Sequence, residues 1–329
     1  MTALVTGGTG FVGGAIVRQL LRRGRRVRVL ARPASRTEPL ERLGVEIARG
    51  DIRDAASVDA ALDGCDTLYH AAAIYEFWIP DEDALLRTEV DGTRNVLEAA
   101  RRRGIAKLVY TSTALVVGEP RGVLGTEETP HRGYYLSRYE KAKALAERVA
   151  EEYLAAGLPV VILRPAAVLG PGDLKTTGRT LIEVLNRRVP ALVRGVLSVA
   201  DIDDVAEAHL AAETRLPGER YIVAAAVVTA EEIFTEACRL AGVRRPPFVP
   251  APAAHVFAAL EELRARLTGG RPMLARETVR LLAHGFRVDG AKAARELGLR
   301  YRPWRDSLRR AVGWYWEQGL LRHRPSVLG

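Results

Sequence analysis

The sequence predicts an α/β fold, in which a Rossmann-type, doubly wound parallel sheet is joined to a smaller, mostly helical and discontinuous second domain. Short apolar segments alternate with helical periodicity through the first half of the chain, and this alternation stops after Pro165. A glycine-rich turn joins the first apolar segment to the first helical one. Strands separated by helices imply right-handed crossovers and a parallel sheet, whose ligands bind beyond the carboxyl ends of the strands.

The first strand is expected at residues 2–6 and is followed by the glycine-rich turn at 7–13. Apolar residues with helical spacing follow, at Phe11, Val12, Ile16, Val17, Leu20 and Leu21. Glycine permits a tight bend and a close approach of pyrophosphate, and the helix N-terminus offers free amides to phosphate. An ordinary strand-to-helix turn is the alternative, but the place of this turn at the first strand favours a dinucleotide site. Its expected residues are Gly7, Thr9, Gly10, Phe11, Val12 and Gly13.

The next elements follow in regular alternation. Further strands are expected at 26–31, 45–48, 67–70, 106–111 and 159–163, and helices at 54–62, 81–103 and 135–156, with Asp54 as the cap of the first of these helices.

The second half of the chain has a different pattern. A loop at 170–172 precedes a helix at 177–188, and residues 200–214 form a short strand and a helix that rejoins the first domain. Further helices are expected at 230–240, 253–267, 276–283 and 304–318. We therefore expect a dinucleotide-binding domain of residues 1–170 with about 200–226, and a substrate-binding domain of residues 171–199 and 227–329.

The composition indicates a globular protein, since 48% of the 329 residues are apolar and 27% are charged. The net charge is +9, but the arginines are scattered and form no basic stripe with interleaved aromatic residues, so no nucleic-acid partner is expected. Cys65 and Cys238 lie far apart without metal-ligand spacing, which predicts free thiols and no metal site. With no apolar run long enough to span a bilayer, we expect a cytoplasmic protein.

The end of the second strand bears on the choice of cofactor. NAD-binding folds usually place Asp or Glu there for the ribose 2′-hydroxyl, whereas this strand ends in Ala31-Arg32, with Ser35 and Arg36 close behind. A guanidinium group can pair with a 2′-phosphate. The sequence therefore favours NADP over NAD, and the alternative is that Arg32 and Arg36 are ordinary surface residues.

Polar residues that can carry chemistry follow the strand at 106–111 and lie on the next helix. Thr111-Ser112-Thr113 ends the strand, and Tyr139 and Lys143 are four residues apart on one helix face. The strand at 67–70 is followed by Ala71-Ala72-Ala73, small residues that would let a flat ring lie against the backbone.

At these positions the chain resembles the extended short-chain dehydrogenase/reductase family. Within it, the chain looks similar to the dihydroflavonol-reductase-like branch, and nearest to the hopanoid-associated sugar epimerases, which carry an aromatic-proline segment like Tyr75–Pro80 here. The segments that carry the resemblance are Thr6–Gly13, Gly50–Ile52, His70–Ala73, Gly92–Thr93, Thr111–Thr113, Tyr139 with Lys143, Arg164–Pro165, Gly170–Gly172 and Asp203–Ala206.

The resemblance implies a role for each group. Tyr139 would exchange a proton with the substrate oxygen, Lys143 would lower the pKa of this phenol from about 10 and hold the nicotinamide ribose, and Thr113 would bond the substrate carbonyl. The further cofactor contacts that it implies are Asp51, Ile52, Ala71, Ala72, Ala73, Thr111, Ser112, Pro165 and Val168.

A second pair has the same spacing as Tyr139 and Lys143. Tyr134 and Arg138 are also four residues apart, but arginine does not readily provide a compact, tunable ammonium group. The length of helix from Lys143 to Gly157 also matches the family, so Tyr139 and Lys143 are favoured.

Two departures from the family pattern bear on the substrate. Glu89 stands where the family usually has Asn, and Val196–Ala200 replaces an Arg-Asp pair and a His that nucleotide-sugar enzymes usually carry. The loss of a cation and a polar group argues against a nucleoside diphosphate in that half of the cleft. The candidates for an apolar substrate pocket are Tyr75, Phe77, Trp78 and Tyr135; for the first three, packing as a lid on the second domain is the alternative.

We therefore expect an NADP-dependent oxidoreductase that interconverts a small-molecule carbonyl compound and its alcohol. An epimerase of a sugar or nucleotide sugar, with tightly bound cofactor, is the second candidate. A non-catalytic dinucleotide sensor is the third, and it is disfavoured because Thr113, Tyr139 and Lys143 are all present. The resemblance also implies a homodimer through the helices at 81–103 and 135–156.

Overall fold

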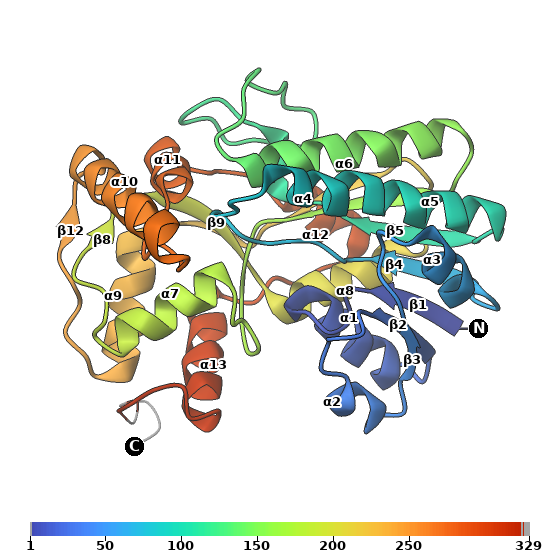
Figure 1. Cartoon of the computed structure of the whole chain (residues 1–329), viewed down its shortest axis with the longest axis horizontal. Coiled ribbons are helices and arrows are strands. Elements are labelled where there is room, and N and C mark those ends of the chain that lie inside the picture. The colour runs from blue at the N-terminus through green and yellow to red at the C-terminus, as the bar shows by residue number, and fades with distance from the viewer. Residues whose placement is uncertain (1, 324, 326–329) are drawn as a thin grey trace.

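The computed structural model describes residues 2–323 and 325, and its centre is a seven-stranded parallel sheet (Figure 1). The strand order is β10-β6-β5-β4-β1-β2-β3, and every neighbouring pair is parallel. The order reverses at β1, as in a doubly wound fold. The strands are β1 (Thr2–Thr6), β2 (Arg26–Ala31), β3 (Glu46–Arg49), β4 (Thr67–His70), β5 (Lys107–Thr111), β6 (Val160–Pro165) and β10 (Arg220–Val223). The predicted Rossmann-type sheet is confirmed.

Helices cover both faces of this sheet, because alternate residues of each strand face opposite sides. In β1, Ala3 and Val5 join one apolar core and Leu4 joins the other. The first core includes residues of α1 (Phe11–Arg22), α8 (Ile202–Ala212) and α12 (Ala291–Leu297); the second includes residues of α3 (Ala55–Leu62), α5 (Gly92–Arg102) and α6 (Arg138–Ala155).

The part of the chain formed by residues 167–199, 226–284 and 304–317 lies at the end of the molecule away from β1, β2 and β3 (Figure 1). It was expected to be mostly helical, but it also contains strands. A sheet of order β11-β9-β7 is formed by β7 (Ala167–Leu169), β9 (Val196–Asp201) and β11 (Ala226–Thr229), and β8 (Leu192–Val193) pairs with β12 (Phe248–Val249). The helices of this part are α7 (Thr176–Leu185), α9 (Ala230–Ala241), α10 (Ala251–Thr268), α11 (Arg276–His284) and α13 (Trp304–Glu317).

Two of the differences between the expected and the observed helix bounds affect the site. The helix expected at 81–103 is divided into α4 (Glu82–Leu86), a π-helical turn (Arg87–Asp91) and α5, which follows it directly. The helix expected from 135 begins at Arg138, because the Ser137 hydroxyl caps it by accepting the amide N–H of Glu140 at 3.0 Å. Tyr135 therefore precedes the helix, while Tyr139 and Lys143 lie on it.

Small elements complete the structure. Helix α2 (Glu38–Glu41) and a 3₁₀-helix (Ala114–Val117) were not expected. Cys65 and Cys238 are free thiols. Among the described residues, no helix combines the length and the apolar character that crossing a bilayer requires. The division of the chain into two domains stays a prediction.

Candidate active site

The glycine-rich turn between β1 and α1 has the geometry of a phosphate cradle. Gly7 has φ +73°, and a Cβ there would lie 2.7 Å from the backbone of Ala71 and Ala72. A Cβ on Gly13 would lie 2.2 Å from the Gly7 carbonyl oxygen. The first amides of α1, which begins at Phe11, have no acceptor within the helix. The turn thus fits a dinucleotide pyrophosphate, since only glycine lets its backbone take this shape.

The expected cofactor residues of the turn other than glycine are Thr9, Phe11 and Val12, and they differ in exposure to solvent. Thr9 is exposed, and Val12 is partly buried against the core. The ring of Phe11 lies close to Gly172, in the loop after β7, where a Cβ would be 3.6 Å from the ring. Val168 of β7 packs against the same core as α1, and Pro165 ends β6.

The carboxyl ends of β2 and β3 bring several arginines together. Arg32 and Arg36 are exposed, and the Ser35 amide donates a hydrogen bond to the Arg32 carbonyl at 2.9 Å. Arg49, the last residue of β3, donates to the Ser35 carbonyl at 3.1 Å. The sequence prediction did not include Arg49, although its place at the end of a strand beside β2 could have indicated it.

The expected adenine residues Asp51 and Ile52 have other partners in this structure. Asp51 binds the Arg53 guanidinium at 2.8 and 3.0 Å, which holds the pKa of this carboxyl below its usual value despite partial burial. Ile52 is buried, and its carbonyl accepts a hydrogen bond from Asn95 at 3.0 Å. The Asp51 carboxylate is thus already paired with a cation in this structure.

A buried hydrogen-bond network fixes the ends of β1 and β4 beneath the three alanines. The Thr6 hydroxyl lies 2.7 Å from Nδ1 of His70 and accepts the Ala72 amide at 3.2 Å. The other ring nitrogen of His70 lies 3.1 Å from the Thr93 hydroxyl. Burial lowers the pKa of His70 to about 3, so the ring is neutral at physiological pH. The network positions the backbone of 71 and 72 against the glycine turn, whereas Ala73 is exposed.

Lys143 is the buried cation of the site. Its Nζ donates a hydrogen bond to the Thr111 carbonyl at 2.9 Å and lies 3.4 Å from the Tyr110 hydroxyl. The carboxylate of Glu89, on the π-helical turn, lies 3.5 Å away, and its other oxygen accepts the Ile74 amide. Burial raises the pKa of Glu89, while Lys143 and the Ile74 amide oppose this effect. The sequence marked Glu89 only as a departure; the structure makes it the ion-pair partner of Lys143.

Tyr139 lies one helical turn before Lys143 and is 6% exposed. The rings of Tyr75 and Phe77 pack edge-on against it, with centroids 5.3 and 5.9 Å away. Burial raises the pKa of Tyr139 above its usual value; Lys143 lowers it and Glu89 raises it further. Lys143 lowers the pKa of this phenol as expected, but burial outweighs the ammonium charge, so the pKa of Tyr139 lies above that of a free tyrosine.

The hydroxyl groups after β5 differ in their hydrogen bonds. Thr111 bonds His209 at 2.8 Å through its hydroxyl, so that group is engaged inside the protein. Thr113 caps the 3₁₀-helix and accepts the Leu115 amide at 3.4 Å. The buried hydroxyl of Ser112 has no hydrogen-bond partner among residues 2–323 and 325. An unpartnered buried hydroxyl at this strand end fits a site that takes a polar ligand.

Two of the four expected substrate residues have other neighbours. Trp78 packs under the guanidinium of Arg266, 5.7 Å from the ring centroid, and the ring of Tyr135 lies 5.1 Å from that of His131. The alternative pair of Tyr134 and Arg138 lies on the surface: Tyr134 is 55% exposed. Arg138 pairs with Glu82 at 3.3 Å. The geometry therefore favours Tyr139 and Lys143 over this pair.

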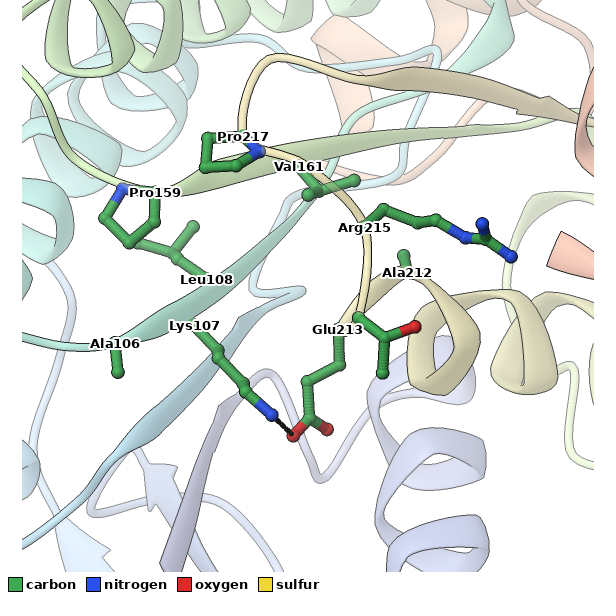
Figure 2. Close-up of a pocket in the computed structure, with 10 residues that line it drawn as sticks. Ala106, Lys107, Leu108, Pro159, Val161, Ala212, Glu213, Arg215 and Pro217 are labelled. Atoms are coloured by element: carbon green, nitrogen blue, oxygen red, sulfur yellow. Dashed lines mark hydrogen bonds and ion pairs between the residues drawn. The ribbon is translucent and has the colours of Figure 1, made fainter. Parts of the chain in front are cut away.

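A surface depression of about 380 Å³ lies at the amino-terminal ends of the strands, opposite their carboxyl ends (Figure 2). It is formed where β5 and β6 begin and α8 ends, and two of its three charged residues, Lys107 and Glu213, pair with each other at 3.3 Å. Glu213 also binds Arg25 at 3.1 Å. Ligands of doubly wound sheets bind at the other ends of the strands, so we place the site around Tyr139.

Comparison with known proteins agrees with this geometry. Residues 3–224 match the model of the NAD dependent epimerase/dehydratase family. A protein of Synechocystis sp., provisionally named dihydroflavonol 4-reductase, is 34% identical over 97% of this chain and 95% of its own length. Sterol demethylase protein B of Methylococcus capsulatus is 35% identical over 98% of this chain and all of its own. The crystal structure of Thermus thermophilus UDP-glucose 4-epimerase in complex with NAD superposes with a TM-score of 0.77, at 28% identity, over 96% of this chain and 99% of that one.

Proposed function

Because the chain belongs to the NAD dependent epimerase/dehydratase family, we propose that it is an NADPH-dependent reductase of a ketone or aldehyde, which also oxidises the corresponding alcohol. It is an NAD(P)-dependent enzyme of the extended short-chain dehydrogenase/reductase type. The observation that carries the proposal is the buried pair of Tyr139 and Lys143, covered by Tyr75 and Phe77.

In this proposal, each of three residues has its own role: Tyr139, Lys143 and Thr113. Tyr139 gives the proton to the carbonyl oxygen during reduction and takes it back during oxidation. Lys143, held by the Thr111 carbonyl and Glu89, stabilises the phenolate that is left behind. Thr113 donates a hydrogen bond to the substrate oxygen and fixes its direction. The bound nicotinamide supplies the hydride.

The glycine turn and the arginines after β2 would hold the dinucleotide. Phosphates would accept hydrogen bonds from the first amides of α1, as the close packing around Gly7 and Gly13 allows. The exposed guanidinium groups of Arg32 and Arg36, with Arg49 beside Ser35, favour a 2′-phosphate and hence NADPH.

An apolar substrate fits the surroundings of Tyr139. Tyr75 and Phe77 pack their aromatic rings against the ring of Tyr139. Residues 196–200, where nucleotide-sugar enzymes usually carry polar groups, lie within β9, which is paired on both sides. The name of the Methylococcus relative refers to a sterol, itself an apolar ring system. These features favour an apolar ketone or aldehyde over a nucleotide sugar.

An epimerase is the second candidate, because the family description and the Thermus structure both name that activity. One experiment separates the two: purified protein is given carbonyl compounds and nucleotide sugars while NADPH absorbance and epimer formation are followed together. A reductase consumes NADPH in proportion to substrate. Epimer formation without net NADPH consumption would replace our proposal, and tight dinucleotide binding without either reaction would indicate a sensor.

The role of Tyr139 has its own test. Tyr139→Phe keeps the ring that packs on Tyr75 and Phe77 and removes only the hydroxyl, so turnover should fall at least 1,000-fold, about the effect of losing general acid catalysis, with cofactor binding retained. Tyr134→Phe, at an exposed tyrosine nearby, is the matched control and should leave turnover unchanged. Full activity of Tyr139→Phe would exclude Tyr139 as the proton donor.

A further inference from the structure

Helix α10 has its large apolar residues on the outside and its small residues on the inside. The buried positions of this helix are Ala254, Ala258, Glu262 and Ala265. The exposed ones include Val256 (65%), Leu260 (61%), Leu263 (54%) and Leu267 (79%), which we call the apolar stripe. Their spacing of three or four residues places them on one face of the helix. A surface helix of a globular protein normally has the reverse arrangement.

The inward face explains why the apolar stripe is left outside. Ala254 and Ala258 share a small core with Val193 and Val279 of α11, and alanine lets the two helices approach closely. Burying a leucine side chain is worth about 1.5–3 kcal/mol, so the stripe leaves several such contributions unused in the isolated chain. Phe257 on the same helix and Met273 in the segment after it are also exposed. Helix α10 lies at the end of the molecule opposite β1, β2 and β3 (Figure 1).

Helices α10 and α11, with the loop between them, carry a net positive charge. Residues 251–284 contain five arginines and three glutamates, with no lysine or aspartate. The two glutamates on α10 are both engaged: Glu261 binds Arg264 at 2.8 Å, and the buried Glu262 binds Arg276 at 2.8 Å. Arg266 makes no ion pair within the described part of the chain and instead lies over the Trp78 ring. The face therefore offers apolar side chains and a guanidinium group without a competing free carboxylate.

We propose that α10 binds the protein peripherally to an anionic lipid surface, with the apolar stripe inserted at the headgroup boundary and the arginines on lipid phosphates. A helix with an apolar face and basic flanks lies in the plane of a membrane interface, and each arginine near an anionic leaflet adds about 1 kcal/mol. A second copy of this chain is a poorer occupant, because a symmetric contact would bring the arginines of both copies together.

Helix α10 and the loop after it contact the segment that covers Tyr139. Arg266 contacts Trp78, and Arg271 pairs with Glu76 at 2.9 Å. Both partners belong to the segment that carries Tyr75 and Phe77. Lipid docking would thus place the substrate side of the site near the membrane surface. The inference goes beyond the proposed reaction and does not depend on it.

The test measures binding of the full chain to vesicles. Wild type should co-sediment with vesicles of phosphatidylcholine and phosphatidylglycerol, and at least tenfold less with phosphatidylcholine alone or in high salt. Leu260→Gln/Leu263→Gln should lose at least tenfold in binding. The matched control Leu43→Gln/Leu216→Gln changes two exposed leucines outside this surface and should bind as wild type does.

Other results would overturn the inference. These are failure of wild type to bind the anionic vesicles, undiminished binding of the Leu260→Gln/Leu263→Gln variant, or equal loss in the control. Dimers in solution that only the stripe variant dissociates, without vesicle binding, would assign the surface to a second copy. Thermal unfolding of both variants checks the fold. Turnover of a water-soluble substrate without vesicles should be the same for all three proteins, so failure of lipid binding is distinguishable from failure of the proposed reaction.

Discussion

Replacing Glu89 by glutamine should make Tyr139 a stronger acid. The Glu89 carboxylate lies 3.5 Å from the Lys143 ammonium, and its charge raises the pKa of Tyr139 while that of Lys143 lowers it. Glutamine keeps the size of the side chain and an oxygen that can accept the Ile74 amide, but it carries no charge. The phenolate of Tyr139 would then form next to a cation that is no longer neutralised, so its pKa should fall.

The size of the shift follows from the charges. At an effective dielectric of about 20, two unit charges 3.5 Å apart interact by about 5 kcal/mol, so Glu89 cancels much of the field that Lys143 exerts on nearby groups. The Tyr139 hydroxyl senses only part of this change, and we expect a fall of about one pKa unit, which corresponds to about 1.4 kcal/mol. The free energy of unfolding of Glu89→Gln should also be lower than that of wild type, because Lys143 stays buried without its anionic partner.

The assay is the pH dependence of alcohol oxidation, which needs the phenolate. In wild type, kcat/KM for oxidation should rise with pH toward the pKa of Tyr139. In Glu89→Gln this rising limb of the pH profile should lie about one pH unit lower. At pH values below the limb, the variant should therefore oxidise alcohol up to about tenfold faster than wild type. Glu127→Gln is the matched control, because Glu127 is also a partly buried carboxylate that accepts a backbone amide, that of Ile222 at 2.7 Å. A limb that stays in place, moves to higher pH, or moves equally in the control would refute the reasoning.

Three further predictions concern the cofactor site and its support. Gly13→Ala should abolish dinucleotide binding or fold poorly, because its Cβ would meet the Gly7 carbonyl at 2.2 Å, whereas Gly14→Ala, with 3.3 Å to its nearest neighbour, should bind normally in calorimetry; equal behaviour of the two would contradict this. Arg32→Ala should weaken NADPH by at least tenfold and NADH by less than twofold; a wild type that binds both cofactors equally would remove the basis for this prediction. Thr6→Val should lower the free energy of unfolding by about 1–3 kcal/mol in urea titrations, since it leaves a buried ring nitrogen and an amide unpaired, while the exposed Thr180→Val should change it by less than about 0.5 kcal/mol. An unchanged free energy of unfolding in Thr6→Val would contradict this prediction and would show that water replaces the two lost hydrogen bonds.

The sequence was sufficient for six of the seven strands of the central sheet and for the glycine turn, but not for β10. Each of the first six strands is a short apolar run flanked by a helix of clear periodicity, and the predicted bounds of β2 and β4 match the structure exactly as residues 26–31 and 67–70. The short strands β7, β8, β10, β11 and β12 escaped prediction because, unlike the four-residue strands β3 and β4, they follow Pro165, where the regular alternation of strand and helix ends. They depend on partners far along the chain, as β7 does on β9.

The π-helical turn shows a second kind of limit. Helical periodicity continues through residues 81–103, and nothing local marks the change of hydrogen bonding at Arg87–Asp91. The turn lies against α6 and places the Glu89 carboxylate at Lys143, a contact that joins residues 54 positions apart. The sequence showed that Glu89 replaces the usual family residue, but it did not show that Glu89 pairs with Lys143.

The acidity of Tyr139 depends on a balance that residue spacing cannot reveal. One ammonium group a helical turn away favours the phenolate, but removing a phenol from water disfavours it, and here the second effect is larger. A phenol with a raised pKa is protonated at neutral pH, which suits a donor that gives its proton to a carbonyl oxygen. The reverse reaction must first form the phenolate, so reduction should be favoured at neutral pH and oxidation at alkaline pH. Glu89 strengthens this asymmetry, since its charge opposes Lys143; this is why its neutral replacement should speed oxidation rather than reduction.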